Sequence, residues 1–138
     1  MQPSRRQIGT FAALVVAQTL HSVEEYLGRL WESFPPARAL TALVSSDRET
    51  GFVIINATLV AFGYWCLLWP VRRGWQSAES LMWFWIVIET VNGIGHPIWS
   101  FRQGAYTPGM ATAPVLLVLA AALAHQSWRH ALRPVKMH

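Results

Sequence analysis

The sequence predicts an all-α fold, a four-helix transmembrane bundle that belongs to a polytopic membrane protein and forms a single domain over residues 1–138. The first observation behind this prediction is composition. Apolar residues make up 53% of the chain and charged residues only 13%, against about a quarter in soluble domains. The second is that four apolar stretches each approach the roughly 20 residues that a membrane-spanning helix needs. These predicted spans are residues 9–30, 52–69, 81–99 and 109–126.

The ends of the predicted spans carry residues that are typical of membrane interfaces and helix boundaries. Tryptophan prefers the membrane–water interface, and proline interrupts regular helices. The residues concerned are Trp69, Pro70, Trp75, Pro97, Trp99, Pro108 and Trp128. The connection between the first two spans contains Pro35–Pro36 followed by an apolar stretch, which predicts a short interfacial helix within residues 36–46.

The basic residues indicate the orientation of the chain. The net charge of +4 alone would be compatible with nucleic-acid binding, but the basic residues occur in short clusters at the ends of the apolar stretches, so we expect no nucleic-acid partner. With the N-terminus inside, the inner side carries Arg5, Arg6, Arg72, Arg73, Arg129, Arg133 and Lys136, and the outer side carries Arg29, Arg38, Arg48 and Arg102. The excess inside predicts that both termini are cytoplasmic. The single cysteine, Cys66, excludes a disulfide framework.

The most informative residues are the ionisable ones inside the spans. His21, Glu24 and Glu25 lie in the first span, and Glu89 and His96 lie in the third. A charged side chain at the bilayer centre costs about 2.5–3.5 kcal/mol even on lenient insertion scales. Such residues persist where they pair, face a cavity or bind something, so five of them in two helices predict a site.

The spacing of the polar residues places them on two facing stripes. Gln18, His21 and Glu25 follow an i, i+3, i+7 pattern, and Glu89, Asn92 and His96 repeat it. The first and third spans run in the same direction, so the two stripes overlap in depth. Asn56 of the second span and Thr112 of the fourth fall at a similar level. We therefore expect one polar site in the outward half of the bilayer.

These residues resemble a known family. The motif HSVEE at residues 21–25 resembles the signature of the HXXEE family of small bacterial membrane proteins, and the stretches ETVNGIGHPIWS and AYTPGMATAP are similar to its companion blocks. The resemblance extends over nearly the whole chain and implies a place in the bacterial inner membrane. It also implies that His21, Glu24 and Glu25 are important, but it supplies no reaction, because the family is uncharacterised.

A metal site is the first interpretation of the polar cluster. Imidazoles and carboxylates are ligands that suit Zn²⁺, Fe or Mn²⁺, and helical bundles build such sites from facing helices. The predicted metal ligands are His21, Glu24, Glu25, Glu89 and His96. Dinuclear carboxylate bundles normally use Glu-x-x-His, whereas this chain has His-x-x-Glu-Glu, which argues against a diiron centre.

Two other interpretations stay open. A carboxyl group in apolar surroundings has a raised pKa and can protonate an alkene or epoxide, so a metal-free isomerase, epoxide hydrolase or cyclase for a terpenoid or sterol-like substrate is the second interpretation. The third is non-enzymatic: the same groups transport or bind protons or metal ions, or merely pair across the helix interface.

We therefore expect an integral membrane enzyme that acts on a lipophilic small molecule, with metal-assisted catalysis. The candidate catalytic residues are Glu24, Glu25, Glu89, Asn92 and Asn56, with the two asparagines orienting substrate or water. The sequence leaves open the substrate, the reaction and whether the chain forms a homo-oligomer.

Overall fold

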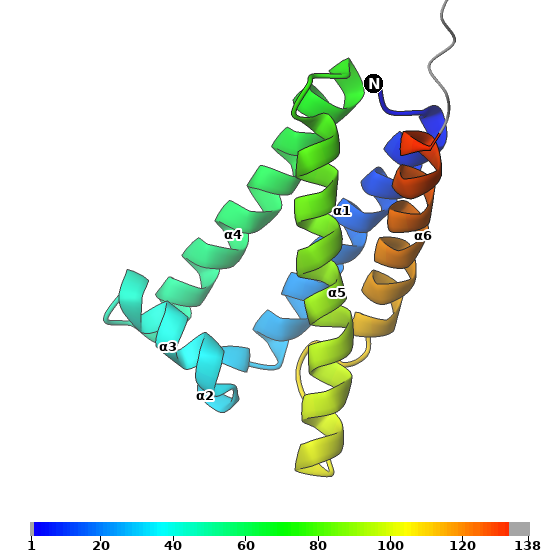
Figure 1. Ribbon diagram of the computed structural model, residues 1–138. Coiled ribbons are helices and arrows are strands. Elements are labelled where there is room, and N and C mark those ends of the chain that lie inside the picture. The colour runs from blue at the N-terminus through cyan, green and yellow to red at the C-terminus, as the bar shows by residue number, and fades with distance from the viewer. Residues whose placement is uncertain (1, 133–138) are drawn as a thin grey trace, which may run out of the picture.

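The computed structural model describes residues 2–132, and these residues form helices joined by short connections (Figure 1). In chain order the helices are α1 (Arg5–Leu27), α2 (Leu30–Ser33), α3 (Pro35–Val44), α4 (Arg48–Cys66), the π-helical turn η1 (Leu67–Val71) that continues α4, α5 (Ala78–Gln103) and α6 (Ala113–Ala131). No strand occurs within residues 2–132. The all-α prediction is confirmed. Arg133 and Lys136, which we assigned to the inner side, lie outside the described residues.

The starts of α1 and α4 follow from side-chain capping. Ser4 and Gln7 form a capping box at the start of α1, in which the Gln7 backbone N–H donates to Ser4 Oγ at 3.2 Å. Asp47 caps α4 by accepting from the Thr50 backbone N–H at 2.9 Å. The short helix predicted within residues 36–46 is present as α3, which begins at Pro35 because proline fits the first turn of a helix.

Each of the four predicted spans corresponds to a long helix, but two proline boundaries were wrong. Pro97 lies inside α5, which continues to Gln103 and ends at Gly104 with φ +64°. Pro70 lies inside η1. An internal proline removes one backbone hydrogen bond, and here the surrounding helix tolerates that loss. In η1 the missing bond coincides with a local widening of the helix to π geometry.

One of the predicted spans is apolar enough to cross a membrane by length and composition alone. Among the described residues it is the stretch Arg48–Val71, with a mean hydropathy of 1.8 over its best window. The inward-facing Gln, His, Glu and Asn residues lower the mean hydropathy of α1 and α5, and the last turns of α6 are polar.

The helices converge at one end and separate at the other. α1 packs against α6, α6 packs along α5, and α4 contacts α1 and reaches α5 through η1. Figure 1 shows α4 and α5 close together at the end that holds the N-terminus and apart at the opposite end, where α2 and α3 lie. The buried core of the converging half is apolar and includes Phe11, Leu14, Met82, Trp85 and Leu116. Towards the separated end the polar residues His21, Glu89 and His96 are also buried, beside a second apolar cluster of Leu30, Trp31 and Phe52.

Gly93 and Gly95 on α5 differ sharply in their surroundings. A Cβ added at Gly93 would lie 2.6 Å from Leu117 Cβ and 3.0 Å from the Leu117 backbone nitrogen, so Gly93 permits the close approach of α5 and α6. A Cβ added at Gly95 would meet nothing within 4 Å.

We therefore predict opposite effects for two alanine substitutions. Gly93→Ala should destabilise the fold by about 1–3 kcal/mol, because backbone atoms of α6 must move to accommodate the methyl group. Gly95→Ala should be neutral or stabilise it by up to about 1 kcal/mol, because alanine favours the helix. The measurement is the free energy of unfolding of both variants in one detergent. Equal effects would contradict the close helix contact.

Candidate functional site

Three buried side chains form a cluster at the separated end of the bundle. His21 and Glu25 come from α1, and His96 comes from α5. Glu25 Oε1 lies 3.3 Å from His21 Nε2 and 3.2 Å from His96 Nε2. One ligand atom from each of the three residues lies within 4.8 Å of the others. The exposed fractions of 0% for His21, 8% for Glu25 and 6% for His96 show that the cluster is withdrawn from solvent.

The local structure explains how the cluster forms. His21 and Glu25 are four residues apart on α1 and therefore lie on the same face of the helix. The two imidazole rings meet edge to face, with their centroids 4.8 Å apart. The His96 ring is flanked by Phe34 and Trp99, which contact each other at a centroid distance of 4.5 Å.

Gly109 closes the cluster from the loop between α5 and α6. Its φ of +89° is a conformation that residues with a side chain rarely adopt. A Cβ at this position would lie 2.6 Å from His96 Cε1 and Nδ1 and 2.8 Å from His21 Cε1. Both the backbone conformation and the space therefore require glycine here.

Glu24 lies beside the cluster but has different partners. Its Oε1 accepts a hydrogen bond from the Ala111 backbone N–H at 2.9 Å, and its Oε2 accepts one from the Thr112 backbone N–H at 2.9 Å. The hydroxyl groups of Thr112 and Tyr106 also donate to it. Both carboxylate oxygens thus accept hydrogen bonds from the residues just before α6. A negative charge is favourable at this position, because it lies at the N-terminus of the helix. The bond to Glu24 raises the pKa of Tyr106 to about 12, so the phenol remains a donor at neutral pH.

The contacts of Thr112 determine the tautomer of His21. Thr112 Oγ1 donates its one proton to Glu24 and lies 2.7 Å from His21 Nδ1. His21 Nδ1–H must therefore be the donor in this second bond. In the neutral ring the lone pair is then on Nε2, which is buried, has no hydrogen-bond partner among the described residues and faces Glu25 Oε1.

Glu89 belongs to a separate polar network one level deeper. Glu89 is fully buried and accepts from Asn92 Nδ2 at 3.3 Å. With the Gln18 amide oriented to satisfy its neighbours, Gln18 Nε2 donates to Glu89 at 2.9 Å and its Oε1 accepts from Ser22 Oγ at 3.1 Å. Ser22 Oγ also lies 2.9 Å from Asn56 Oδ1 on α4, but its single proton can be donated to only one of these two oxygens.

A cavity of about 220 Å³ adjoins both the cluster and this network. Its polar lining comes from Gln18, Glu25, Thr41, Asn56, Asn92 and His96. Its apolar lining comes from Leu30, Phe34, Pro36, Ala37, Leu40, Phe52, Ile55, Leu59 and Ile88. The cavity thus lies between α1, α4 and α5 and is covered by α2 and α3, and its lining combines polar and apolar side chains.

The structure brings together three of the five predicted metal ligands. Glu24 and Glu89 lie outside the group formed by His21, Glu25 and His96. Asn56 and Asn92 do line the cavity, as the depth argument predicts. Sequence reasoning missed Gly109 and the contribution of Phe34. The Pro108–Gly109 pair predicts a turn, but nothing in the sequence indicates that this turn packs against two imidazole rings.

A family model described as a protein of unknown function with an HXXEE motif matches residues 12–124. The chain belongs to the HXXEE family. The motif that names the family supplies His21 and Glu25 of the cluster and the neighbouring Glu24. No curated protein and no solved structure matches the chain.

We predict that Gly109→Ala disturbs the cluster more than Gly104→Ala does. Both glycines have positive φ, so each substitution should cost about 1–2 kcal/mol of backbone strain. Only a methyl group at 109 would contact the imidazoles, because a Cβ at 104 would meet nothing within 4 Å. The histidine side-chain NMR signals of isotope-labelled protein should therefore shift in the first variant and stay in place in the second. Unchanged signals in both would contradict the packing of Gly109.

Proposed function

We propose that this HXXEE protein is a polytopic membrane enzyme that acts on a lipophilic small molecule at a metal ion bound by His21, Glu25 and His96. The observation that carries the proposal is the convergence of these three side chains, buried and beside a half-apolar cavity. The membrane setting, the metal and the substrate class each have their own support.

Outward-facing apolar stripes support a four-helix transmembrane bundle. One stripe on α1 consists of Val16, Leu20, Val23 and Leu27, which are 49–75% exposed. One on α5 consists of Val87, Val91, Ile94 and Ile98, which are 46–64% exposed. Exposed apolar surface of this extent on helices whose polar residues face inward suits a lipid environment.

The basic residues support an orientation with both termini in the cytoplasm. Arg5 and Arg6 begin α1, Arg72 and Arg73 follow η1, and Arg129 lies in the last turn of α6. In Figure 1 these three segments lie at the same end of the bundle, opposite α2 and α3. The excess of positive charge is expected on the inner side of a bacterial inner membrane, which puts the cluster in the outward half.

The hydrogen-bond pattern around His21 favours a cation in the cluster. The Nε2 lone pair of the neutral ring faces the carboxylate oxygen of Glu25 at 3.3 Å, and two such atoms repel each other. A cation between them removes the repulsion, and it is either a proton or a metal ion. Two ligand atoms on one ion at about 2.0–2.2 Å are about 3–3.5 Å apart, which agrees with both distances to Glu25. All three ligand atoms lie within 4.8 Å of one another, so the two imidazoles would move closer together to share the ion.

The ligand set suits a first-row divalent ion. Two histidines with one carboxylate are typical of catalytic Zn²⁺ and of non-haem Fe²⁺ sites, both of which keep positions open for water or substrate. Such an ion supplies Lewis acidity and lowers the pKa of a bound water. The chain would contribute the open side of the site, which is the cavity lined by Glu25 and His96.

The cavity supports a lipophilic substrate with one polar group. The apolar residues of its lining, most of which belong to α3 and α4, would hold a hydrocarbon body, while Asn56 and Asn92 would orient a polar group or a water. Its volume of about 220 Å³ is below the 300–1,000 Å³ that is typical of drug-sized ligands, so the substrate is small or inserts only one end. Glu89, held by Gln18 and Asn92, is the carboxyl that can exchange a proton without serving as a ligand.

Metal analysis is the first test. Protein purified in detergent should carry close to one Zn, Fe or Mn ion per chain. His21→Ala, His96→Ala and Glu25→Gln should each lose it, because each removes one of three ligands. Glu24→Gln should weaken binding by about 10–100-fold, as expected of a residue that positions a ligand through Thr112. His125→Ala, an exposed position at the other end of the bundle, is the matched control and should bind normally.

A metal-free acid–base enzyme is the second candidate, and the buried Glu89 network favours it. The Glu89→Gln variant distinguishes the metal-dependent mechanism from the acid–base mechanism. In the metal enzyme this variant should retain the ion and its folding stability while losing turnover. If fully metal-free protein turned over substrate, and only Glu89→Gln abolished that activity, the acid–base mechanism would replace the metal one. If Glu25→Gln and Glu89→Gln changed stability alone, the polar groups would be structural.

A further inference from the structure

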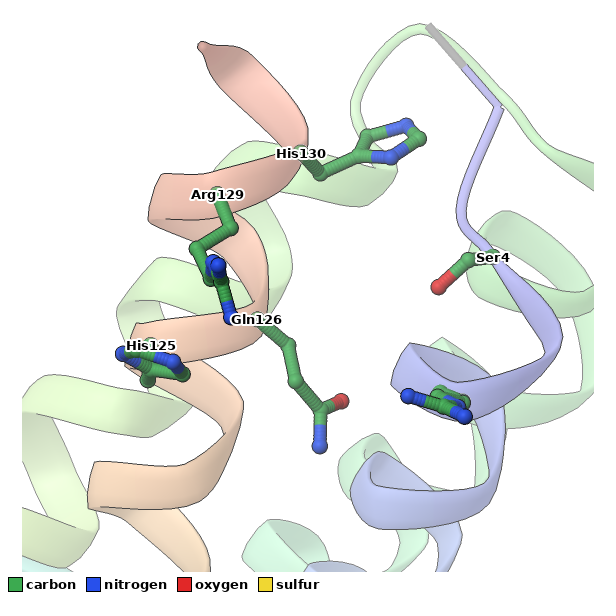
Figure 2. Close-up of a pocket in the computed structure, with 6 residues that line it drawn as sticks. Ser4, His125, Gln126, Arg129 and His130 are labelled. Atoms are coloured by element: carbon green, nitrogen blue, oxygen red, sulfur yellow. The ribbon is translucent and has the colours of Figure 1, made fainter. Parts of the chain in front are cut away.

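A second and larger cavity lies at the opposite end of the bundle from the cluster. Its volume is about 760 Å³ and it lies between the first turn of α1 and the last turns of α6. Six residues line it: Ser4, Arg6, His125, Gln126, Arg129 and His130. Figure 2 shows the side chains of α6 arranged along one side of the hollow and Ser4 on the other. None of the six lining residues is acidic.

Two side-chain hydrogen bonds hold the helices together beside this cavity. Gln7 Nε2 donates to Ser127 Oγ at 3.2 Å, and Gln126 Nε2 donates to Thr10 Oγ1 at 3.0 Å. These bonds join α1 to α6 at fixed positions, while Ser4, Arg6 and His130 lie nearer the helix ends. The cavity therefore lies between two helices whose relative position these bonds fix.

The lining has the chemistry of an anion site. Arg6 and Arg129 are permanently charged, and a guanidinium group binds phosphate oxygens with paired N–H donors. Ser4 and the two histidines add donors of shorter reach. His130 Nε2 and Gln126 Oε1 are buried and have no hydrogen-bond partner within residues 2–132.

We propose that this cavity binds a phosphate group, supplied either by the headgroup of an anionic phospholipid or by a soluble phosphate ester. Arg6 and His21 are fifteen residues apart on α1, so the two sites are separated by roughly 20 Å along the helix. The cavity is thus independent of the metal cluster. A lipid as the source of the phosphate rests on the membrane orientation given under the proposed function. That orientation puts these residues at the inner surface, where basic pockets between helices bind headgroups.

The test is a binding titration of full-length protein in detergent, read by native mass spectrometry. Phosphatidylglycerol and phosphatidylcholine form the lipid arms, and glycerol phosphate forms the soluble arm. The Arg6→Gln/Arg129→Gln variant should lose at least about tenfold in affinity for the phosphate-bearing anion. The matched control is Arg72→Gln/Arg73→Gln, which removes the same charge at the same end from residues that do not line the cavity.

The lipid and soluble probes show which molecule supplies the phosphate, and the two double variants show whether the cavity binds it. Preference for phosphatidylglycerol over both other probes identifies a lipid, and equal binding of glycerol phosphate identifies a soluble ester. An equal loss in both double variants would overturn the site in favour of diffuse electrostatic attraction, and no loss in the cavity variant would overturn it outright. Metal content and melting temperature measured on the same samples separate these outcomes from unfolding and from failure of the proposed metal function.

Discussion

The attachment of Glu24 to the chain before α6 is the constraint on which the candidate site depends. Through its bonds to Ala111 and Thr112 this carboxylate fixes the connection between α5 and α6 against α1. That connection carries Thr112, which orients His21, and Gly109, which packs against both imidazoles. Glu24 of α1 thus positions the loop, and Thr112 of this loop orients His21 of the same helix. The side chains of α1 and α5 meet the connection before α6 at the cluster, because Glu24 holds this connection against α1.

Helix geometry separates the roles of the two adjacent glutamates. Successive residues on an α-helix point about 100° apart, so Glu24 and Glu25 must face different surroundings. Glu25 shares the face of His21 and meets His96, whereas Glu24 faces the loop. The spacing in the HXXEE motif is therefore consistent with one glutamate in the cluster and one that supports the histidine from outside it. Thr112 lies outside the motif but contacts both its histidine and its first glutamate, so it is as important to the site as the motif residues.

The parts of the structure that the sequence predicts are those that depend on local pattern. The length of the apolar stretches predicts four long helices, and the common direction of the first and third spans places His21, Glu25 and His96 at one level. The exclusion of Glu24 and Glu89 from the cluster depends on side-chain directions and on partners more than sixty residues away, which spacing does not contain. Pro97 was misjudged for a separate reason. A proline removes one backbone hydrogen bond but does not by itself fix where a helix ends, and α5 continues past Pro97 to Gln103.

X-ray absorption at the edge of the ion that copurifies with the protein tests the central claim most directly, because it reports the atoms bound to that ion. The account predicts a first shell of nitrogen and oxygen at about 2.0–2.2 Å with the multiple-scattering pattern of two imidazoles. In His96→Ala protein reloaded with excess metal the pattern should fall to that of one imidazole. An ion without imidazole ligands, or a spectrum that this substitution leaves unchanged, would contradict a metal centre formed by His21, Glu25 and His96.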